Sequence, residues 1–200
     1  MRNVLADLAL ESEAATILFM RLARAFDAHL AADAGEAAAE SDIERAWRRI
    51  VTPAAKFWVC KRALEFTGEA MEVLGGNGYV EESPMARFYR EAPVNSIWEG
   101  SGNVMCLDVL RALERDPVGA QALLAQWRRS SDGHTELGSA LAELEALLGA
   151  PPEAREVLAR RIAQQLVLCA QAALMLDAAP AASADAFIAT RLGQGAGRCG

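Results

Sequence analysis

Apolar residues at helical spacing constrain the fold of this chain more than any other feature of its sequence. From Arg2 to His29 they recur every three, four or seven positions, which places one apolar stripe on a single long helix: Val4, Leu8, Ala15, Leu18, Leu22 and Phe26. Alanine and leucine dominate, β-branched residues are sparse, and the seven prolines lie mostly between periodic segments. The pattern predicts an all-α chain.

A second long helix is predicted to begin at Ser41. Ser41 followed by Glu44 is a capping box, in which each side chain covers the exposed backbone N–H of the other residue. Apolar residues follow at helical spacing: Ile43, Trp47, Ile50, Ala54, Phe57, Cys60, Leu64 and Ala70. Pro53 removes one backbone hydrogen bond, so we expect a kink or a short break there, and Gly75-Gly76 should end the helix.

The rest of the chain is divided by proline and glycine. Ser83 and Pro84 predict the cap and first position of a short helical turn, and Pro93 is expected to interrupt regular structure. Asp116-Pro117 predicts the end of a helix over 103–114. Further helices are expected over 118–130, 135–148, 152–178 and 184–192.

Charge and cysteine spacing exclude several classes of protein. The net charge is −7, with 20 basic and 27 acidic residues, which argues against nonspecific attraction to nucleic acid or anionic lipid. No apolar run reaches the roughly 18 residues of a membrane span, and Asp7 and Glu11 interrupt the place of a signal peptide, so we expect a cytoplasmic protein. The four cysteines lie far apart without a Cys-x-x-Cys pair, so neither a metal site nor a disulfide framework is expected.

Two short motifs carry chemistry. In the turn over 74–79, Leu-Gly-Gly-Asn-Gly-Tyr, the glycines allow the backbone to approach a pyrophosphate, although an isolated motif of this kind more often just ends a helix. In Ile97-Trp98-Glu99-Gly100-Ser101, Glu99 offers a base beside an aromatic side chain that can remove water from it. Taken alone, Glu99 is better interpreted as an ordinary loop carboxylate that caps the following helix.

Taken together, the segments 74–79, 87–91 (Arg-Phe-Tyr-Arg-Glu) and 97–101 resemble the C-terminal helical domain of the acyl-CoA dehydrogenase flavoprotein family. The segments 93–103 and 105–110 resemble its AidB-like branch, which is linked to the adaptive response to DNA alkylation. The resemblance implies a bundle of two long antiparallel helices and shorter ones over 1–114. It also implies a helical extension over 115–200.

The resemblance implies a catalytic role for Glu99. In the family, the base at this position removes the α-proton of an acyl-CoA while the β-hydrogen leaves as hydride to the flavin. The backbone N–H of the same residue donates to the thioester oxygen, which stabilises the developing enolate charge. We therefore expect the Glu99 carboxyl to point into a cleft near the glycine turn, with Trp98 keeping water away from it.

The resemblance also implies contacts with FAD, held mainly by a neighbouring subunit. Gly75 and Gly76 would contact its pyrophosphate. Glu72 stands where the family usually has glutamine, and a carboxylate there would repel the phosphates. Ser101 and Asn103 would lie beside the flavin, and the Ser101 hydroxyl could also cap the following helix.

Three hypotheses follow for the whole chain. Because family members are much longer, the first is a C-terminal portion of an FAD-dependent oxidoreductase acting on CH–CH groups, inactive by itself and binding little FAD. The second is a DNA-associated helical module, with Arg191 in a segment that resembles the DNA-associated extension of the AidB-like branch. Further arginines would support it: Arg128, Arg129, Arg155, Arg160, Arg161 and Arg198. The third is an oligomerisation surface, since the family forms homo-oligomers through these helices.

Overall fold

The computed structural model describes residues 1–35 and 40–193, and within those ranges every regular element is helical. The all-α prediction is therefore confirmed. The first elements are α1 (Arg2–Asp33), α2 (Asp42–Ala46), the π-helical turn η1 (Trp47–Val51), α3 (Thr52–Val73), α4 (Gly76–Tyr79) and α5 (Pro84–Asn95). They are followed by α6 (Gly102–Arg115), α7 (Pro117–Ser130), α8 (Thr135–Leu148), α9 (Pro152–Val157), α10 (Ala159–Ala178) and α11 (Ala181–Arg191). None of these helices is both long and apolar enough to cross a membrane.

The second long helix begins as the sequence predicts. The Ser41 hydroxyl accepts a hydrogen bond from the Glu44 backbone N–H at 3.3 Å. The Glu44 carboxylate instead accepts two hydrogen bonds from Arg21 of α1, at 2.8 and 3.0 Å, so the capping box is half formed. The helix runs through α2, η1 and α3 without a break, and Pro53 is preceded by the wider turn of η1. Such a turn accommodates the backbone donor that a proline lacks.

Three predictions about the extent of helices were wrong, two of them at prolines. Ser83 caps α5, a full helix of 12 residues rather than a short turn. Pro93 lies inside that helix, in its last turn, where the loss of one hydrogen bond is offset by the packing of α5 against α3. The helix predicted over 152–178 is divided at Leu158 into α9 and α10.

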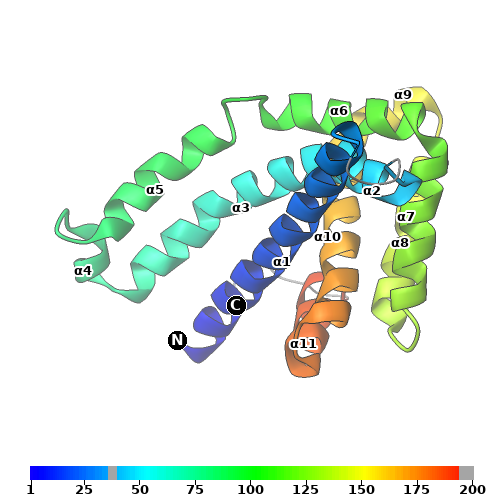
Figure 1. Ribbon diagram of the computed structural model, residues 1–200. Helices are drawn as coiled ribbons and strands as arrows, with labels where there is room; N and C mark the ends of the chain where they lie inside the picture. The colour runs from blue at the N-terminus through cyan, green and yellow to red at the C-terminus, as the bar shows by residue number, and fades with distance from the viewer. Residues whose placement is uncertain (36–39, 194–200) are drawn as a thin grey trace.

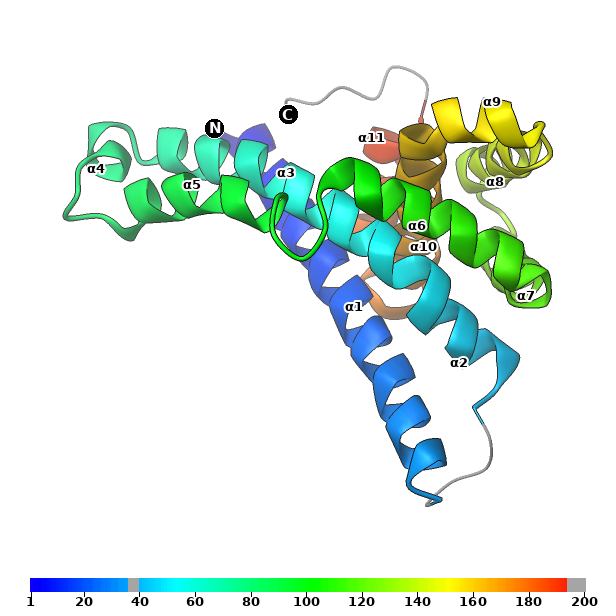
Figure 2. The same ribbon diagram turned by 90° about the horizontal axis from the view of Figure 1, so that it is seen from above.

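The helices form a compact bundle with a projecting arm (Figure 1). Helix α10 is largely buried and packs against α1, α3, α6 and α8. Helices α3 and α5 run antiparallel and extend away from the bundle, with α4 at the tip, and the view from above shows the same arm (Figure 2). We call α4, α5 and the second half of α3 the arm.

The core of the bundle is one continuous cluster. Trp47 of η1 and Trp127 of α7 meet edge to face with ring centroids 5.7 Å apart, and both are almost fully buried. Trp47 Nε1 donates to Gln126 Oε1 at 3.0 Å, which satisfies its polar edge. The same cluster includes Leu18 of α1 and Ile162 of α10, so the apolar core crosses the expected division between 1–114 and 115–200. The boundary itself stays a prediction.

Candidate functional site

Glu99 lies in the loop between α5 and α6, in an uncommon backbone conformation. Its φ is +56°, the one positive value at a non-glycine residue within 1–35 and 40–193. Gly100 follows with φ +108°, a conformation that favours glycine, and a Cβ there would also require the Met105 side chain to move, since its Cε would lie only 2.3 Å away. The loop therefore turns sharply and presents the Glu99 side chain at the surface.

Glu99 lies on the wall of a groove of about 600 Å³. Its charged lining residues are Arg45, Arg48, Arg49, Lys56, Glu99, Asp108, Arg111, Arg115 and Asp116. Cations outnumber carboxylates, so we call this the basic groove. Sequence reasoning missed it because its arginines come from α2, η1 and α6, which meet only in the folded chain.

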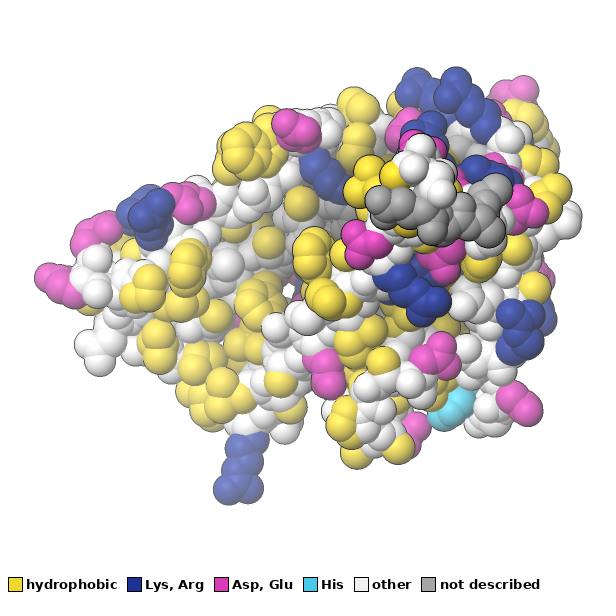
Figure 3. All heavy atoms as spheres, in the orientation of Figure 1, with side chains coloured by type: hydrophobic (Ala, Val, Ile, Leu, Met, Phe, Trp, Pro, Cys, Tyr) yellow, Lys and Arg dark blue, Asp and Glu magenta, His cyan; other side chains and the backbone are white. Residues whose placement is uncertain are grey.

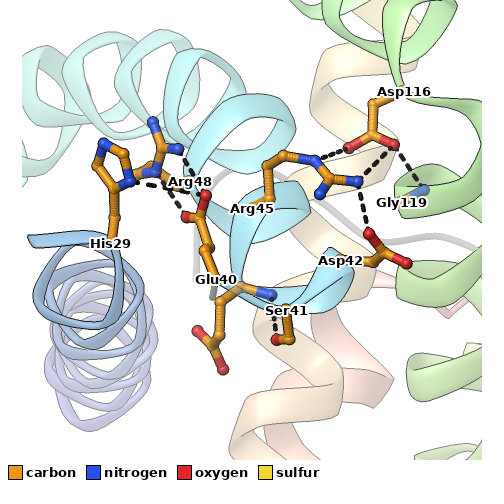
Figure 4. A network of polar contacts seen from close by, with 9 residues as sticks. His29, Glu40, Ser41, Asp42, Arg45, Arg48, Asp116 and Gly119 are labelled. Atoms are coloured by element: carbon orange, nitrogen blue, oxygen red, sulfur yellow. Dashed lines mark hydrogen bonds and ion pairs between the residues drawn. The ribbon is translucent and has the colours of Figure 1, made fainter. Parts of the chain in front are cut away.

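Two of the arginines are held by carboxylates (Figure 4). Arg45 donates to Asp42 at 2.7 Å and to Asp116 at 3.1 Å, and Asp116 also accepts from the Gly119 N–H at 2.9 Å. Burial alone would raise the pKa of Asp116, but the hydrogen bonds from Arg45 and Gly119 outweigh it and lower that pKa. Arg48 pairs similarly with Glu40.

Arg48 is paired with a carboxylate, whereas three other arginines of the basic groove have no partner among the described residues. Arg48 donates to both oxygens of Glu40, at 2.9 and 2.8 Å, and these hydrogen bonds lower the pKa of the Glu40 carboxyl. Arg49, Arg111 and Arg115 make no hydrogen bond or ion pair with the part of the chain that the structure describes. Three guanidinium groups of the basic groove are thus available to an anionic ligand.

Trp98 does not shield the Glu99 carboxyl as expected. The Trp98 side chain is 60% exposed, and Glu99 is exposed as well, because the loop lies on the surface and no other described segment packs over it. The expected removal of water from the carboxylate is therefore wrong for this chain by itself. A second molecular surface over the loop would be needed to achieve it.

The glycine turn lines a second groove, at the other end of α3. This groove has a volume of about 900 Å³, and Glu72, Gly75 and Gly76 are all part of its wall. Gly75 has a φ of +59°, and Cβ atoms built at Gly75 and Gly76 would meet nothing within 4 Å. The backbone at Gly75 and Gly76 is therefore sterically open, while contact with a ligand there stays a prediction.

The charge of this second groove is unfavourable for phosphate. Its ionisable lining residues are Asp7, Glu11, Arg62, Glu65, Glu69, Glu72, Tyr79 and Tyr89. The lining has five carboxylates and one cation, Arg62, and Arg191 outside the lining pairs with two of the carboxylates, so the groove stays net acidic and we call it the acidic groove. A pyrophosphate placed against Gly75 and Gly76 would meet like charges, with Glu72 only one of them. By its charge, the acidic groove does not fit the pyrophosphate of FAD.

The two grooves lie far apart. The Glu99 loop contacts α3 at Lys56, whereas the glycine turn follows the last residue of α3, Val73. At a helical rise of about 1.5 Å per residue the two points are about 25 Å apart along α3. The glycine turn lies near the tip of the arm and the Glu99 loop near its base (Figure 1). The expectation that Glu99 points toward the glycine turn was wrong, because the straight helix α3 separates them.

Ser101 and Asn103 lie at the start of α6. Ser101 occupies the N-cap position, but its hydroxyl makes no capping hydrogen bond and the residue is exposed, so the hydroxyl is available to a ligand. Asn103 Oδ1 accepts from Arg160 Nε at 2.8 Å, and the Arg160 guanidinium lies 5.8 Å from the centre of the Phe57 ring. Asn103 is therefore already engaged with α10.

The arginines considered for DNA binding are mostly paired inside the chain. Arg191 is 10% exposed and pairs with Asp7 and Glu11 of α1, which leaves little of its guanidinium for a phosphate. Three others have carboxylate partners: Arg128 with Glu145, Arg155 with Glu114, and Arg161 with Glu143. Arg198 lies outside the described residues. DNA contact by Arg191 stays a prediction, and its geometry is that of a structural ion pair.

Comparison with known proteins places these features in a family. The family model described as "Acyl-CoA dehydrogenase, C-terminal domain" matches residues 1–114. The Escherichia coli (strain K12) protein named "Putative acyl-CoA dehydrogenase AidB" is 47% identical over 188 residues, which are 94% of this chain and 32% of that protein. Acyl-CoA dehydrogenase family member 11 of Caenorhabditis elegans is 42% identical over 76 residues, 38% of this chain and 12% of that protein.

A solved structure agrees in fold. The crystal structure of Caenorhabditis elegans ACDH-11 in complex with C11-CoA matches 96% of this chain and 35% of that chain, with a TM-score of 0.76 and 25% identity. The chain thus spans about a third of the length of the relatives that it matches over most of its own residues. The resemblance to the AidB-like branch is also confirmed. The chain belongs to the acyl-CoA dehydrogenase family and carries the C-terminal helical domain of that family.

Proposed function

We propose that this chain supplies the acid-base part of an FAD-dependent acyl-CoA dehydrogenase, with Glu99 as the base. The observation that carries the proposal is the position of Glu99 on the wall of the basic groove, together with three arginines that have no described partner. In this proposal the substrate is an acyl-CoA thioester. We also propose that the chain divides into a domain over 1–114 and an extension over 115–200. The helices of the extension complete the bundle.

The basic groove suits the charged end of a CoA thioester. Guanidinium groups bind phosphate oxygens through paired N–H donors, and Arg49, Arg111 and Arg115 have no partner among the described residues that would compete for them. A CoA whose phosphates lie against these arginines would bring the acyl group into reach of the same groove wall. The Trp98–Gly100 loop contributes one carboxylate, that of Glu99, to the same wall.

The proposed step is a proton transfer. The Glu99 carboxylate takes the proton from the carbon next to the thioester carbonyl, and the electron pair of that C–H bond moves onto the thioester oxygen. The Glu99 backbone N–H donates a hydrogen bond to this oxygen and stabilises its negative charge. FAD, in the family, supplies the acceptor for the β-hydrogen.

The described residues do not build a FAD site by themselves. The acidic groove repels a pyrophosphate, and the exposed Glu99 loop has no second wall to enclose a ring. We therefore expect the purified chain to bind little FAD and to oxidise no acyl-CoA unaided. A preparation that carries one flavin per chain, seen by its visible absorbance, would contradict this expectation.

Proton transfer by Glu99 can be tested without flavin. The chain is incubated with a straight-chain acyl-CoA in D₂O, and deuterium at the α-carbon is measured by NMR against the Glu99→Gln variant. We expect faster incorporation with the natural chain, by at least about tenfold, since a positioned base contributes about 10²–10⁴-fold. Equal rates for the two proteins would refute Glu99 as the base.

We also propose that the chain forms homo-oligomers through the arm. Large apolar side chains are exposed there, among them Tyr79, Phe88 and Tyr89. Figure 3 shows hydrophobic side chains gathered over this part of the molecule. Exposed apolar patches of this kind mark association surfaces. Light scattering should give a mass above 21.4 kDa, and a monomer at micromolar concentration would contradict the proposal.

A further inference from the structure

One side chain of α3 holds the loop that carries Glu99. Lys56 Nζ donates a hydrogen bond to the Trp98 carbonyl oxygen at 2.7 Å and another to the Gly100 carbonyl oxygen. These two carbonyls flank Glu99 in sequence. Lys56 is 42 and 44 residues away from its two acceptors, so the contact is tertiary and not part of any local turn.

The Lys56 contact fixes the direction of the Glu99 N–H. The Trp98 carbonyl and the Glu99 N–H belong to one planar trans peptide, so they point in opposite directions. Holding the Trp98 oxygen toward Lys56 therefore turns the Glu99 N–H away from the ammonium group. This N–H has no acceptor among residues 1–35 and 40–193, so it remains free to donate to a ligand.

The contact also explains how Glu99 keeps a strained backbone conformation. A non-glycine residue at φ +56° persists only where its surroundings fix it from several sides. Two charge-assisted hydrogen bonds on either side of Glu99 provide that constraint. Without them, the loop could relax to a conformation with negative φ, which would reorient both the side chain and the N–H of Glu99.

Lys56 does not form the carboxylate pair that a surface lysine usually makes. Asp108 and Asp116 line the same groove, yet no ion pair joins either of them to Lys56 within the described residues. Two of the three ammonium donors are directed at backbone carbonyls instead. This arrangement suits control of loop geometry better than control of surface charge.

We infer that Lys56 is a positioning residue for the proposed proton transfer: it holds the Trp98 and Gly100 carbonyls so that the Glu99 N–H and carboxylate face the substrate together. The inference rests on the proposed function of Glu99. It adds a residue of the groove lining that acts on the reaction through the loop, because its described hydrogen bonds both go to backbone carbonyls.

The loop geometry can be tested separately from activity. The variant Lys56→Met keeps the length of the side chain and removes every donor, while Lys56→Arg retains donors. Lys61→Met is the matched control, because Lys61 is exposed on the same helix and makes no hydrogen bond or ion pair with described residues. Thermal unfolding confirms that each variant folds, and Lys56→Gln replaces Lys56→Met if that variant does not.

Two measurements report the loop directly. In Lys56→Met the carbonyl ¹³C resonances of Trp98 and Gly100 should shift, and Glu-specific protease should cut after Glu99 about tenfold faster, because the loop opens locally. Lys56→Arg should return both toward the natural chain, and Lys61→Met should change neither. Unchanged carbonyl resonances and an unchanged cleavage rate in Lys56→Met would overturn the inference.

Deuterium incorporation at the α-carbon of an acyl-CoA tests the functional part. Lys56→Met should lower the rate at saturating acyl-CoA about tenfold or more, a larger change than the few-fold loss of affinity expected when one cation of the groove lining is removed. Lys56→Arg should recover part of the rate. If the natural chain itself shows no incorporation, the proposed function fails, and the loop measurements still decide the role of Lys56. If Lys56→Met is as fast as the natural chain, the positioning role fails while the proposed function stands.

Discussion

The grooves at the two ends of α3 differ in charge, although the motifs beside them, 74–79 and 97–101, lie close together in the sequence. At the base of the arm, Glu99 lies beside the basic groove and three arginines without described partners. At the tip, Gly75 and Gly76 line the acidic groove, where five carboxylates face one arginine. One groove favours a phosphate-bearing ligand and the other repels it.

Because of this difference in charge, two properties of a binding site, steric access and suitable charge, lie in different grooves. The open backbone at Gly75 and Gly76 gives a ligand steric access, but access alone does not give affinity. The basic groove has the more suitable charge for an anion. We therefore propose that an anionic ligand binds this chain at the base of the arm and not at its tip.

The largest expected effect comes from removing the charge of the basic groove. Replacing Arg49, Arg111 and Arg115 together by glutamine should weaken CoA binding by about 2–3 kcal/mol, roughly a hundredfold, as three phosphate contacts are lost. Calorimetric titration at two salt concentrations measures this loss, which should shrink in high salt. A control with the same charge change replaces Arg87, Arg128 and Arg161, which lie outside the groove. Equal affinity of the two triple variants for CoA would show that the charge of the basic groove has no special part in CoA binding.

A smaller effect is expected from the carboxylate that orders the basic groove. Asp116 caps α7 and binds Arg45, so Asp116→Ala should lower the free energy of unfolding by about 1–2 kcal/mol. Because folding lowers the pKa of Asp116, its contribution is present above its ordinary value of 3.8 and is lost as pH falls. Urea unfolding of both proteins between about pH 3 and about pH 7, the range in which carboxyl groups titrate, should show the difference become smaller toward the acid end. A difference that grows in acid would contradict this role.

The glycine turn allows a paired test at the other end of α3. Gly75→Ala should destabilise the chain by about 1–2 kcal/mol, because a residue with a Cβ is strained at its positive φ of +59°. Gly76→Ala should change stability by less than about 0.5 kcal/mol, since no atom lies near its Cβ. Thermal unfolding measures both. Equal losses would mean that the turn is more crowded than the structure shows.

The smallest expected effect concerns the charge of the acidic groove. Glu72→Gln should raise the affinity of the chain for ADP about threefold, less than about 1 kcal/mol, because one of several exposed carboxylates is neutralised. An NMR titration with ADP measures the change at the Gly75 and Gly76 amides. Glu153→Gln, on α9 and far from the groove, is the control. An unchanged affinity in Glu72→Gln would show that this carboxylate points away from the ligand.

Local signals in the sequence predicted most helix boundaries. The Ser41 side chain accepts the backbone hydrogen bond expected of a cap, and Asp116, where a boundary was predicted, also caps a helix, so nearby residues decide where these helices begin. Pro93 was misjudged because tertiary packing of α5 on α3 outweighs the local cost of a proline. The break at Leu158 carries neither proline nor glycine, so the sequence offers no local signal for it.

The candidate site was predictable only in part. The motif around Glu99 identified the loop and its family, but not its neighbours, since Lys56 and Arg49 approach from a helix distant in sequence. The spacing of Arg111 and Arg115 by four residues could have signalled a basic stripe on one helix face. The role of Arg191 could not be read, because its partners Asp7 and Glu11 lie at the other end of the chain.

The most direct test of the central claim is to locate bound acyl-CoA on the chain. The claim is that the ligand occupies the basic groove beside Glu99 and not the groove at the glycine turn. An amide chemical-shift titration with an acyl-CoA should perturb the Glu99 loop, the first turns of α6 and the region of Arg49. Perturbations confined to Glu72, Gly75 and Gly76, with the Glu99 loop unchanged, would contradict the account.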